Sequence, residues 1–483
     1  MENKIKIHNS LTRKTEEFQP LNSPEVKMYV CGPTVYDEPH IGHARSAYVF
    51  DVIRRYLAYR GFKVKFVRNV TDVDDKIIDK AKKEYPGEDL NAAVKKVSEK
   101  YLGLYHQDMK LLGILEPDAE PKATEYLTSD RPLMQNFIAG LNEKGAAYVS
   151  GGDVYFDIKK AKSYGKLSNQ SLDKMESGTR VMAGENKRDP LDFALWKSAK
   201  PDEPSWDSPW GKGRPGWHME CSVMSSELLG DEFDIHGGGL DLIFPHHENE
   251  LAQSEAAGKK FAKYWIHHGL LTINAQKMSK SLGNFVTFKD ILLKGYSAEV
   301  LKICYLTVHY SKPLDFSWER MDGAREELDR IKECISKIDY RISQRKEDWM
   351  QSAPVIKYLD FKKEIDGLIE KFKNAMDDDF NTPQAKSVIL QMMPVFYINQ
   401  LGLENIECLK YVKNAIIELC NILGLSFKED ALTLEEKHLF EERQNARENK
   451  NYKLADELRK ALEAKGIILE DTKDGQTTWR RKI

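Results

Sequence analysis

The chain has 483 residues, of which 41% are hydrophobic and 31% are charged, and its formal net charge is −3. A chain of this length is expected to form about three domains with sizeable cores. The composition excludes a membrane-spanning protein, because no apolar run approaches the roughly 18 residues that a spanning helix needs. It also excludes binding of nucleic acid through overall positive charge, so any contact with RNA must use local basic surface.

The amino terminus and the cysteines both predict a cytoplasmic protein. Residues 1–6 lack the apolar core of a signal peptide. Six cysteines in a chain of this length are not a disulfide framework. Four of them lie in apolar helical contexts and predict buried packing: Cys304, Cys334, Cys408 and Cys420. No apolar surface stripe stands out, so we expect a monomer.

Residues 20–120 alternate strand-like and helical runs, which predicts the first half of a doubly wound parallel sheet. A strand over 26–31 and a helix over 44–60 flank the string His40-Ile41-Gly42-His43. Such a strand, turn and helix aim backbone N–H groups and the positive end of the helix dipole at an anion, which suits a triphosphate. Gly42 permits close approach of a ligand, and both imidazoles can donate to phosphoryl oxygens. The alternative is a chance match of four residues.

The pattern loosens between residues 121 and 212. A strand over 153–158 and irregular chain over 202–209 predict a connective insertion beside the site. The sheet resumes near 213 and continues through 264–269. From about 318 the periodicity is helical, with apolar residues at spacings of three and four: Leu328, Ile331, Ile335 and Ile338. We therefore expect a helical bundle after the sheet.

A candidate metal site is scattered over the first two thirds of the chain. Cys31 stands at the carboxyl end of the first strand, where ligands bind in open α/β sheets. Cys221 follows much later, and His246 and Glu250 are four residues apart, on one face of a helix. Two thiolates, an imidazole and a carboxylate suit tetrahedral zinc. Because the ligands are not paired in sequence, the alternative is cysteines and a histidine in ordinary core positions.

The second candidate nucleotide motif is Lys277-Met278-Ser279-Lys280-Ser281. Its polar, loop-like setting would let Lys277 and Lys280 close over the pyrophosphate end of ATP as mobile point charges. Taken alone, the string is equally compatible with a solvated loop.

The last 50 residues predict a helical hairpin over 435–465 that is dense in arginine and lysine. Planar arginines and Trp479 beside carboxylates suit splayed RNA bases, by stacking and by edge hydrogen bonds. The alternative is a solvated helical face followed by a charged tail.

The histidine and lysine strings together resemble the signature of class I aminoacyl-tRNA synthetases. Residues 29–37, 213–221 and 233–239 are similar to the cysteinyl-tRNA synthetase family in particular. The resemblance implies activation of L-cysteine by ATP with Mg²⁺, through an adenylate, and transfer to a cysteine-accepting tRNA. It also implies one zinc ion per chain, which binds the thiolate of the substrate and is held by Cys31, Cys221, His246 and Glu250. Serine cannot match a zinc–thiolate bond, so discrimination can come from that contact.

The same resemblance implies roles for further residues. The catalytic and ATP-binding set is His40, Gly42, His43, Gly238, Lys277 and Lys280. The pocket for the amino acid includes Thr71, Trp217 and His236. Positions linked to anticodon reading are Arg447, Asp456 and Asp471. From the residues alone, some of these positions have a structural alternative. Trp217 can be a core aromatic, the acidic run 72–75 can be a solvated helix start, and the glycine run 237–239 can be a turn.

The expected architecture is an α/β protein whose Rossmann-type, doubly wound parallel sheet is split by a connective insertion. The expected segments are 1–120 and 213–317 for the two halves of the catalytic domain, 121–212 for the insertion, 318–430 for the bundle and 431–483 for an anticodon-binding domain. One rival is a ligase that joins cysteine to an amino sugar, against which the intact tail argues. The other is a tRNA-binding paralogue without catalysis, against which the intact histidine and lysine strings argue.

Overall fold

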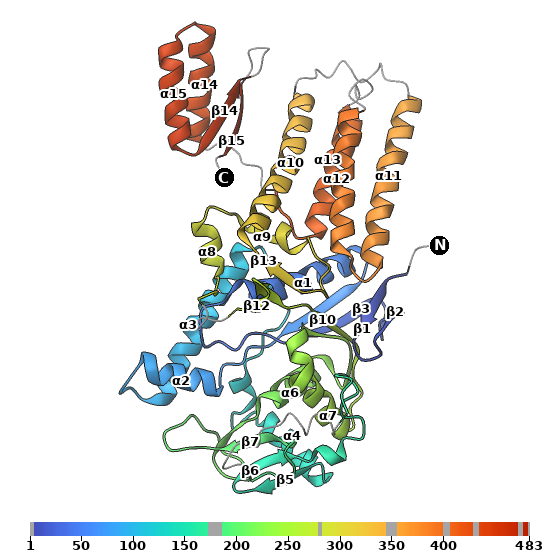
Figure 1. Ribbon diagram of the computed structural model, residues 1–483, viewed down its shortest axis with the longest axis vertical. Coiled ribbons are helices and arrows are strands. Elements are labelled where there is room, and N and C mark those ends of the chain that lie inside the picture. The colour runs from blue at the N-terminus through green and yellow to red at the C-terminus, as the bar shows by residue number, and fades with distance from the viewer. Residues whose placement is uncertain are drawn as a thin grey trace.

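The computed structural model describes residues 4–171, 186–278, 283–343, 355–398, 406–427, 434–471 and 477–481. Within these ranges no helix is both long enough and apolar enough to cross a membrane. Figure 1 shows a sheet-containing body at the centre, a smaller sheet-containing lobe at one end and long helices at the other.

The central sheet has four strands in the order β10–β9–β3–β4, and each neighbouring pair is parallel. The strands are β3 (Glu25–Val30), β4 (Lys63–Arg68), β9 (Glu232–Gly239) and β10 (Phe261–His268). Successive residues of β3 face two separate cores: Met28 and Val30 belong to one, and Tyr29 to the other. The first core includes α1 (Ile41–Tyr59) and the second includes α6 (Trp217–Leu229). Helices thus cover both faces, which confirms the doubly wound α/β fold.

Acidic side chains start the two helices that follow β4. Asp74 accepts a hydrogen bond from the backbone N–H of Lys76 at the start of α2 (Asp75–Glu84), and Asp89 does the same for Ala92 in α3 (Leu90–Leu111). Such caps satisfy N–H groups that have no partner within the helix. The acidic run 72–75 is therefore, in part, a helix start.

The chain between α3 and α6 forms the second lobe. It contains η1 (Ala123–Tyr126), α4 (Leu133–Glu143) and an antiparallel sheet in the order β5–β6–β7–β8. These strands are β5 (Ala147–Ser150), β6 (Asp153–Phe156), β7 (Phe193–Ser198) and β8 (Gly213–Pro215), with η2 (Ile158–Lys160) after β6. Phe156, Phe193 and Trp196 share the second core with Tyr29 of β3. The lobe therefore packs directly on one face of the central sheet.

After β9 come η3 (Leu240–Leu242), η4 (Ile243–His247) and α7 (Glu248–Ala256), which returns to β10. A small sheet follows, in which β11 (Leu271–Ile273) pairs with β12 (Gln276–Lys277) and β13 (Leu314–Phe316). Between β12 and β13 lie α8 (Phe288–Leu293) and α9 (Ala298–Tyr305). Near the amino terminus, β1 (Lys6–Asn9) and β2 (Lys14–Glu17) form a hairpin.

The helical bundle consists of α10 (Trp318–Ser343), α11 (Val355–Asp377), α12 (Thr382–Ile398) and α13 (Ile406–Ile422). Leu328, Ile331 and Ile338 are buried as expected, whereas Ile335 is only half-buried and Cys334 takes the core position beside it. The bundle is bonded to α1: the Tyr48 hydroxyl donates to the carbonyl of Leu423, and the Tyr56 hydroxyl donates to Asp377. The four cysteines outside the candidate metal site are all buried and free.

The final segment contains α14 (Leu434–Glu448) and α15 (Tyr452–Ala464), as the hairpin over 435–465 predicts, and then a strand pair that the sequence reasoning missed. In this pair β14 (Ile467–Asp471) runs antiparallel to β15 (Thr477–Arg481). Leu462, Ile467 and Leu469 form a small core of their own, with Trp479 packed against it.

Candidate active site

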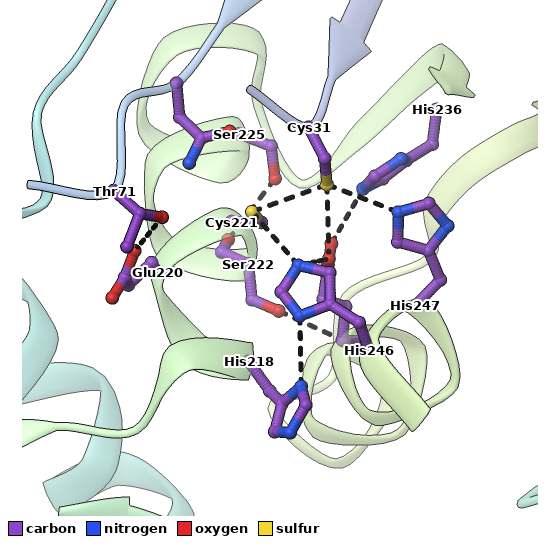
Figure 2. Close-up of polar contacts among 12 residues, drawn as sticks. Cys31, Thr71, His218, Glu220, Cys221, Ser222, Ser225, His236, His246 and His247 are labelled. Atoms are coloured by element: carbon purple, nitrogen blue, oxygen red, sulfur yellow. Dashed lines mark hydrogen bonds and ion pairs between the residues drawn. The ribbon is translucent and has the colours of Figure 1, made fainter. Parts of the chain in front are cut away.

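The four candidate metal ligands meet at the carboxyl-terminal edge of the central sheet (Figure 2). Cys31 directly follows β3, Cys221 lies on α6 and His246 lies in η4, as Figure 2 labels them. Glu250 lies on α7. The two sulfur atoms are 3.6 Å apart. Nε2 of His246 is 3.7 Å from Sγ of Cys221 and 2.9 Å from Oε1 of Glu250. The same Oε1 is 3.6 Å from Sγ of Cys31, so the four donor atoms surround one point.

The spacing and chemistry of these donors fit a zinc ion. Sulfur ligands bonded to tetrahedral zinc at about 2.3 Å lie about 3.8 Å apart, close to three of the separations above. The shorter separation joins His246 to Glu250, whose nitrogen and oxygen form shorter bonds to zinc. Two thiolates and an imidazole favour zinc over hard cations such as Mg²⁺. Cys221, His246 and Glu250 are buried and Cys31 is half-buried, so most of the site is shielded from solvent.

Local charges favour the metal-binding form of two of the four ligands. Burial opposes ionisation of Glu250, yet His236 and His246 hold its pKa well below the usual range. Burial also opposes ionisation of Cys221, but contacts with Cys31 and His246 lower its pKa to about 7. Metal binding requires a carboxylate, thiolates and a neutral imidazole, and these shifts favour the binding form of Glu250 and Cys221. In contrast, burial and Cys221 raise the pKa of Cys31 well above its usual range, and despite burial Glu250 raises the pKa of His246 to about 10, so a metal would have to displace a proton from each of these two groups.

Trp217 and His236, two of the expected pocket residues, lie directly behind the ligands. The Trp217 ring stacks on His246, with centroids 3.9 Å apart, and about a third of Trp217 is exposed. Nε2 of His236 is 2.7 Å from Oε2 of Glu250. Contacts of this kind fix the orientation of ligand side chains.

Three histidines of the cluster were missed by the sequence reasoning. Nδ1 of His218 is 3.0 Å from Nδ1 of His246, and Nε2 of His247 is 3.2 Å from Sγ of Cys31. His247 also contacts His267, through Nδ1 and Nε2 at 2.8 Å. Each follows or precedes another histidine or a tryptophan in the sequence, and only the fold shows which atoms these rings contact. His247 completes a second group of donor atoms within 4.8 Å of one another: Cys31, His236, His247 and Glu250.

Thr71 lies at the carboxyl-terminal edge of the sheet, beyond β4, and is buried. Its hydroxyl donates to Oε2 of Glu220 at 2.8 Å. Glu220 is also buried, and burial, together with Cys221, holds its pKa well above the usual range. Because the hydroxyl proton is already donated, Thr71 presents oxygen lone pairs to any substrate beside it.

His40 and His43 form the start of α1 and differ from the expected arrangement. Nδ1 of His40 accepts from the backbone N–H groups of Gly42 and His43, at 3.0 and 3.3 Å, and the backbone N–H of His40 donates to Nδ1 of His43. The N–H of Ile41 donates to the carbonyl of Val286. The helix therefore does not offer these N–H groups to a phosphate, because the protein itself uses them.

The two imidazoles instead offer their other nitrogens. Each Nδ1 accepts a hydrogen bond, so a neutral ring carries its proton on Nε2. Burial lowers the pKa of His40 to about 4 and that of His43 to about 3, so both are neutral at pH 7. The rings stack with centroids 3.8 Å apart, which presents two Nε2–H donors side by side.

The lysine string reaches this helix start from the other half of the sheet. A Cβ on Gly42 would lie 3.1 Å from Cε of Met278 and 2.8 Å from a carbon of His40, so the position has no space for a side chain. Lys277 is largely exposed, with Nζ 3.6 Å from Oδ2 of Asp241. The structure thus brings Lys277 and Met278 to the histidines, whereas Lys280 lies outside the described residues.

The glycine run at the end of β9 is enclosed by protein atoms. A Cβ on Gly238 would lie 2.7 Å from His247, and one on Gly239 would lie 2.5 Å from Asp241. Gly238 therefore packs against the metal cluster through His247, and Gly239 packs against Asp241, the acidic neighbour of Lys277. This packing accounts for the glycine without a nucleotide.

The candidate tRNA-binding residues lie in the last segment. The Arg447 guanidinium donates to the hydroxyl of Thr477, Asp456 is exposed on α15, and Asp471 pairs with Thr477 across the β14–β15 ladder. Trp479 is half-buried against the small core, so part of its ring serves packing.

Three family profiles match the chain. Residues 17–326 match the class I (C) tRNA synthetase catalytic domain, residues 371–428 a DALR domain, and residues 429–480 the cysteinyl-tRNA ligase anticodon binding domain. A curated cysteine–tRNA ligase from Thermodesulfovibrio yellowstonii is 47% identical, over 99% of this chain and 100% of the relative.

Solved structures with the same fold are more distant in sequence. The methionyl-tRNA synthetase of Mycobacterium tuberculosis, in complex with methionyl-adenylate, has a TM-score of 0.58 at 15% identity and covers 83% of this chain and 89% of its own. A LeuRS ternary complex from Agrobacterium radiobacter has a TM-score of 0.58 at 12% identity, with 85% and 87% covered. At these identities the likeness concerns the fold alone.

Proposed function

This chain belongs to the cysteine–tRNA ligase family of class I tRNA synthetases, and from that premise we propose that it joins L-cysteine to a cysteine-accepting tRNA through a cysteinyl-adenylate. ATP with Mg²⁺ supplies the adenylate, and one zinc ion per chain selects the amino acid. The observation that carries the proposal is the convergence of Cys31, Cys221, His246 and Glu250 at the carboxyl-terminal edge of the central sheet.

Selection of cysteine rests on the donor set. A zinc ion held there supplies a Lewis-acidic centre that favours a thiolate over a hydroxyl, which a serine side chain cannot match. Cys31, Cys221, His246 and Glu250 hold the ion, while Trp217 and His236 keep His246 and Glu250 in position. A site whose main contact is missing in the competitor needs no separate editing domain.

Thr71 would bind the other end of the amino acid. Its hydroxyl proton is donated to Glu220, so its lone pairs suit the α-ammonium group of the substrate. With the sulfur and the ammonium fixed, the carboxylate is aimed at the α-phosphorus of ATP. That carboxylate is already ionised, so no side chain has to remove a proton from it.

The residues around α1 would stabilise the phosphates. Nε2–H groups of His40 and His43 donate to oxygens that gain charge during transfer, and because the rings are neutral they do not repel the Mg²⁺ that accompanies ATP. Lys277, and Lys280 from the neighbouring loop, would neutralise the leaving pyrophosphate. Gly42 leaves no side chain at this helix start, and Gly238, whose missing Cβ faces His247, would bring only its backbone to ATP.

The last segment would read the tRNA. Arg447, Asp456, Asp471 and Trp479 offer guanidinium, carboxylate and aromatic groups of the kinds that recognise unstacked bases. We also propose a cytoplasmic monomer whose segments follow the boundaries 1–120, 121–212, 213–317, 318–430 and 431–483.

The test is cysteine-dependent exchange of labelled pyrophosphate into ATP, with serine as competitor and Cys221→Ser as the control variant. We expect rapid exchange with cysteine, none with serine, and collapse in the variant. Aminoacylation of tRNA then tests the second step. Absence of exchange in a folded, zinc-loaded protein would refute the proposal.

A further inference from the structure

A line of polar groups runs from the surface to the sulfur of Cys31. Ser10 lies between β1 and β2 and is half-buried; its Oγ is 2.8 Å from Nδ1 of His267 on β10. Nε2 of His267 is 2.8 Å from Nδ1 of His247, and Nε2 of His247 is 3.2 Å from Sγ of Cys31. Both rings are buried. Each ring nitrogen in the line has one partner.

The sulfur fixes the direction of every hydrogen bond in this line. When the cluster holds its metal, Cys31 is a thiolate, which can only accept, so Nε2 of His247 carries a proton. A neutral His247 then has a bare Nδ1, which accepts from Nε2–H of His267. Nδ1 of His267 is bare in turn and accepts the hydroxyl proton of Ser10.

We propose that His247, held in one tautomer by His267 and Ser10, is a positioning residue that donates an N–H···S hydrogen bond to the Cys31 thiolate and so tunes the affinity of the cluster for the thiolate of the substrate. The proposal rests on the proposed function above. It assigns His247 a place outside the ligand set, although its Nε2 is near enough to Cys31 to be taken for a ligand.

The physical need for such a donor follows from charge. Two thiolates and one carboxylate around a divalent cation already carry a net charge of about −1, so an incoming thiolate meets an anionic centre. A hydrogen bond to a thiolate withdraws charge from the sulfur. Cys31 then donates less to the metal, which leaves the metal better able to accept a further sulfur.

The alternative hypothesis is that His247 binds the metal, and it requires the hydrogen bond between His247 and His267 to run in the opposite direction. If His247 were a ligand, as a member of the group Cys31, His236, His247 and Glu250, its Nε2 would be bare and Nδ1–H would donate toward His267. The two readings therefore differ in what removal of the ring does to the metal itself.

The experiment uses the full chain with Co²⁺ in place of zinc, measured without cysteine or ATP. The readouts are cobalt bound per chain and the wavelength of the sulfur-to-cobalt charge-transfer absorption. The variants are His247→Leu, which removes the donor; His247→Gln, whose amide N–H reaches the place of Nε2–H; and Ser10→Ala at the surface end. The control is His309→Gln, a histidine that instead contacts Ser311 and Asp379.

We expect every protein to bind one cobalt ion. In His247→Leu the absorption shifts to longer wavelength, because the lone pair of the Cys31 sulfur is no longer stabilised by a hydrogen bond. The shift is smaller in Ser10→Ala and absent in His247→Gln and in the control. In pyrophosphate exchange, His247→Leu raises the KM for cysteine about tenfold and leaves kcat little changed.

Four outcomes would overturn the proposal. Cobalt retained in His247→Leu with an unshifted absorption means that no hydrogen bond acts on the sulfur. Cobalt lost from both His247 variants, or two ions bound to the unaltered chain, means that His247 is a ligand. If His247→Leu does not fold, an unshifted absorption in Ser10→Ala decides against the proposal. Failure of cysteine activation in the unaltered chain refutes the proposed function and leaves the absorption test intact.

Discussion

Substitutions at His40 can separate its structural and chemical roles. Nδ1 of His40 caps α1 by accepting from two backbone N–H groups, at 3.0 and 3.3 Å. In the function proposed above, Nε2–H donates to a phosphate. The amide of asparagine can take the place of the cap but has no group at the position of Nε2. His40→Asn should therefore keep the cap and lose the donor, whereas His40→Ala loses both.

The expected magnitudes follow from these contacts. Loss of an N-cap costs about 1 kcal/mol of unfolding free energy, and loss of one donor to a transition-state oxyanion costs at least about 100-fold in kcat. In urea unfolding, His40→Asn should match the unaltered chain and His40→Ala should be less stable by that amount. In pyrophosphate exchange, the kcat of both variants should fall by about the same factor. An active His40→Asn would refute the role of Nε2–H, and equal stability of the two variants would refute the cap.

Three further expectations concern other parts of the site. Lys277→Ala should slow pyrophosphate exchange and leave urea unfolding unchanged, because its side chain is 75% exposed; a stability change would contradict this. Arg447→Ala should lower aminoacylation of tRNA but leave pyrophosphate exchange intact, and loss of both would argue against a role confined to tRNA. Burial lowers the pKa of His268 to about 4, so the unfolded chain takes up this proton first and stability should fall as pH drops from 6.5 toward 4, by about 1.4 kcal/mol per pKa unit. His268→Gln should flatten that slope in urea unfolding at a series of pH values, and an unchanged slope would contradict the assignment.

Sequence periodicity predicted the layers well where packing is repetitive. Residues of β3 face two cores alternately, and a strand buried on both faces has the apolar run that the sequence shows. The bundle helices likewise follow from spacings of three and four. The pair β14–β15 was missed because its residues include glutamate, aspartate and arginine, and only Leu469 opposite Trp479 provides an apolar pairing.

Within the site, residue types predicted which side chains would come together, but they did not predict the hydrogen-bond partners of those side chains. His40 and His43 were expected beside free N–H groups, but their own Nδ1 atoms and Val286 take those hydrogen bonds. Ser10 and His267 carry no local signal at all, because their contact joins positions 257 residues apart. Such contacts arise from the fold, and a linear pattern does not contain them.

Helix α1 belongs to the central body and is also hydrogen-bonded to the helical bundle. Its 19 residues span about 28 Å as one rod. The histidines stand at one end, while Tyr48 and Tyr56 bond it to the last turn beyond α13 and to α11. Any tilt of the bundle, such as a bulky RNA could impose, would therefore turn the same helix that carries the two histidines proposed to donate to phosphate. A movement of the bundle would therefore change the position of His40 and His43 directly, through the helix itself and without a flexible loop between the two parts.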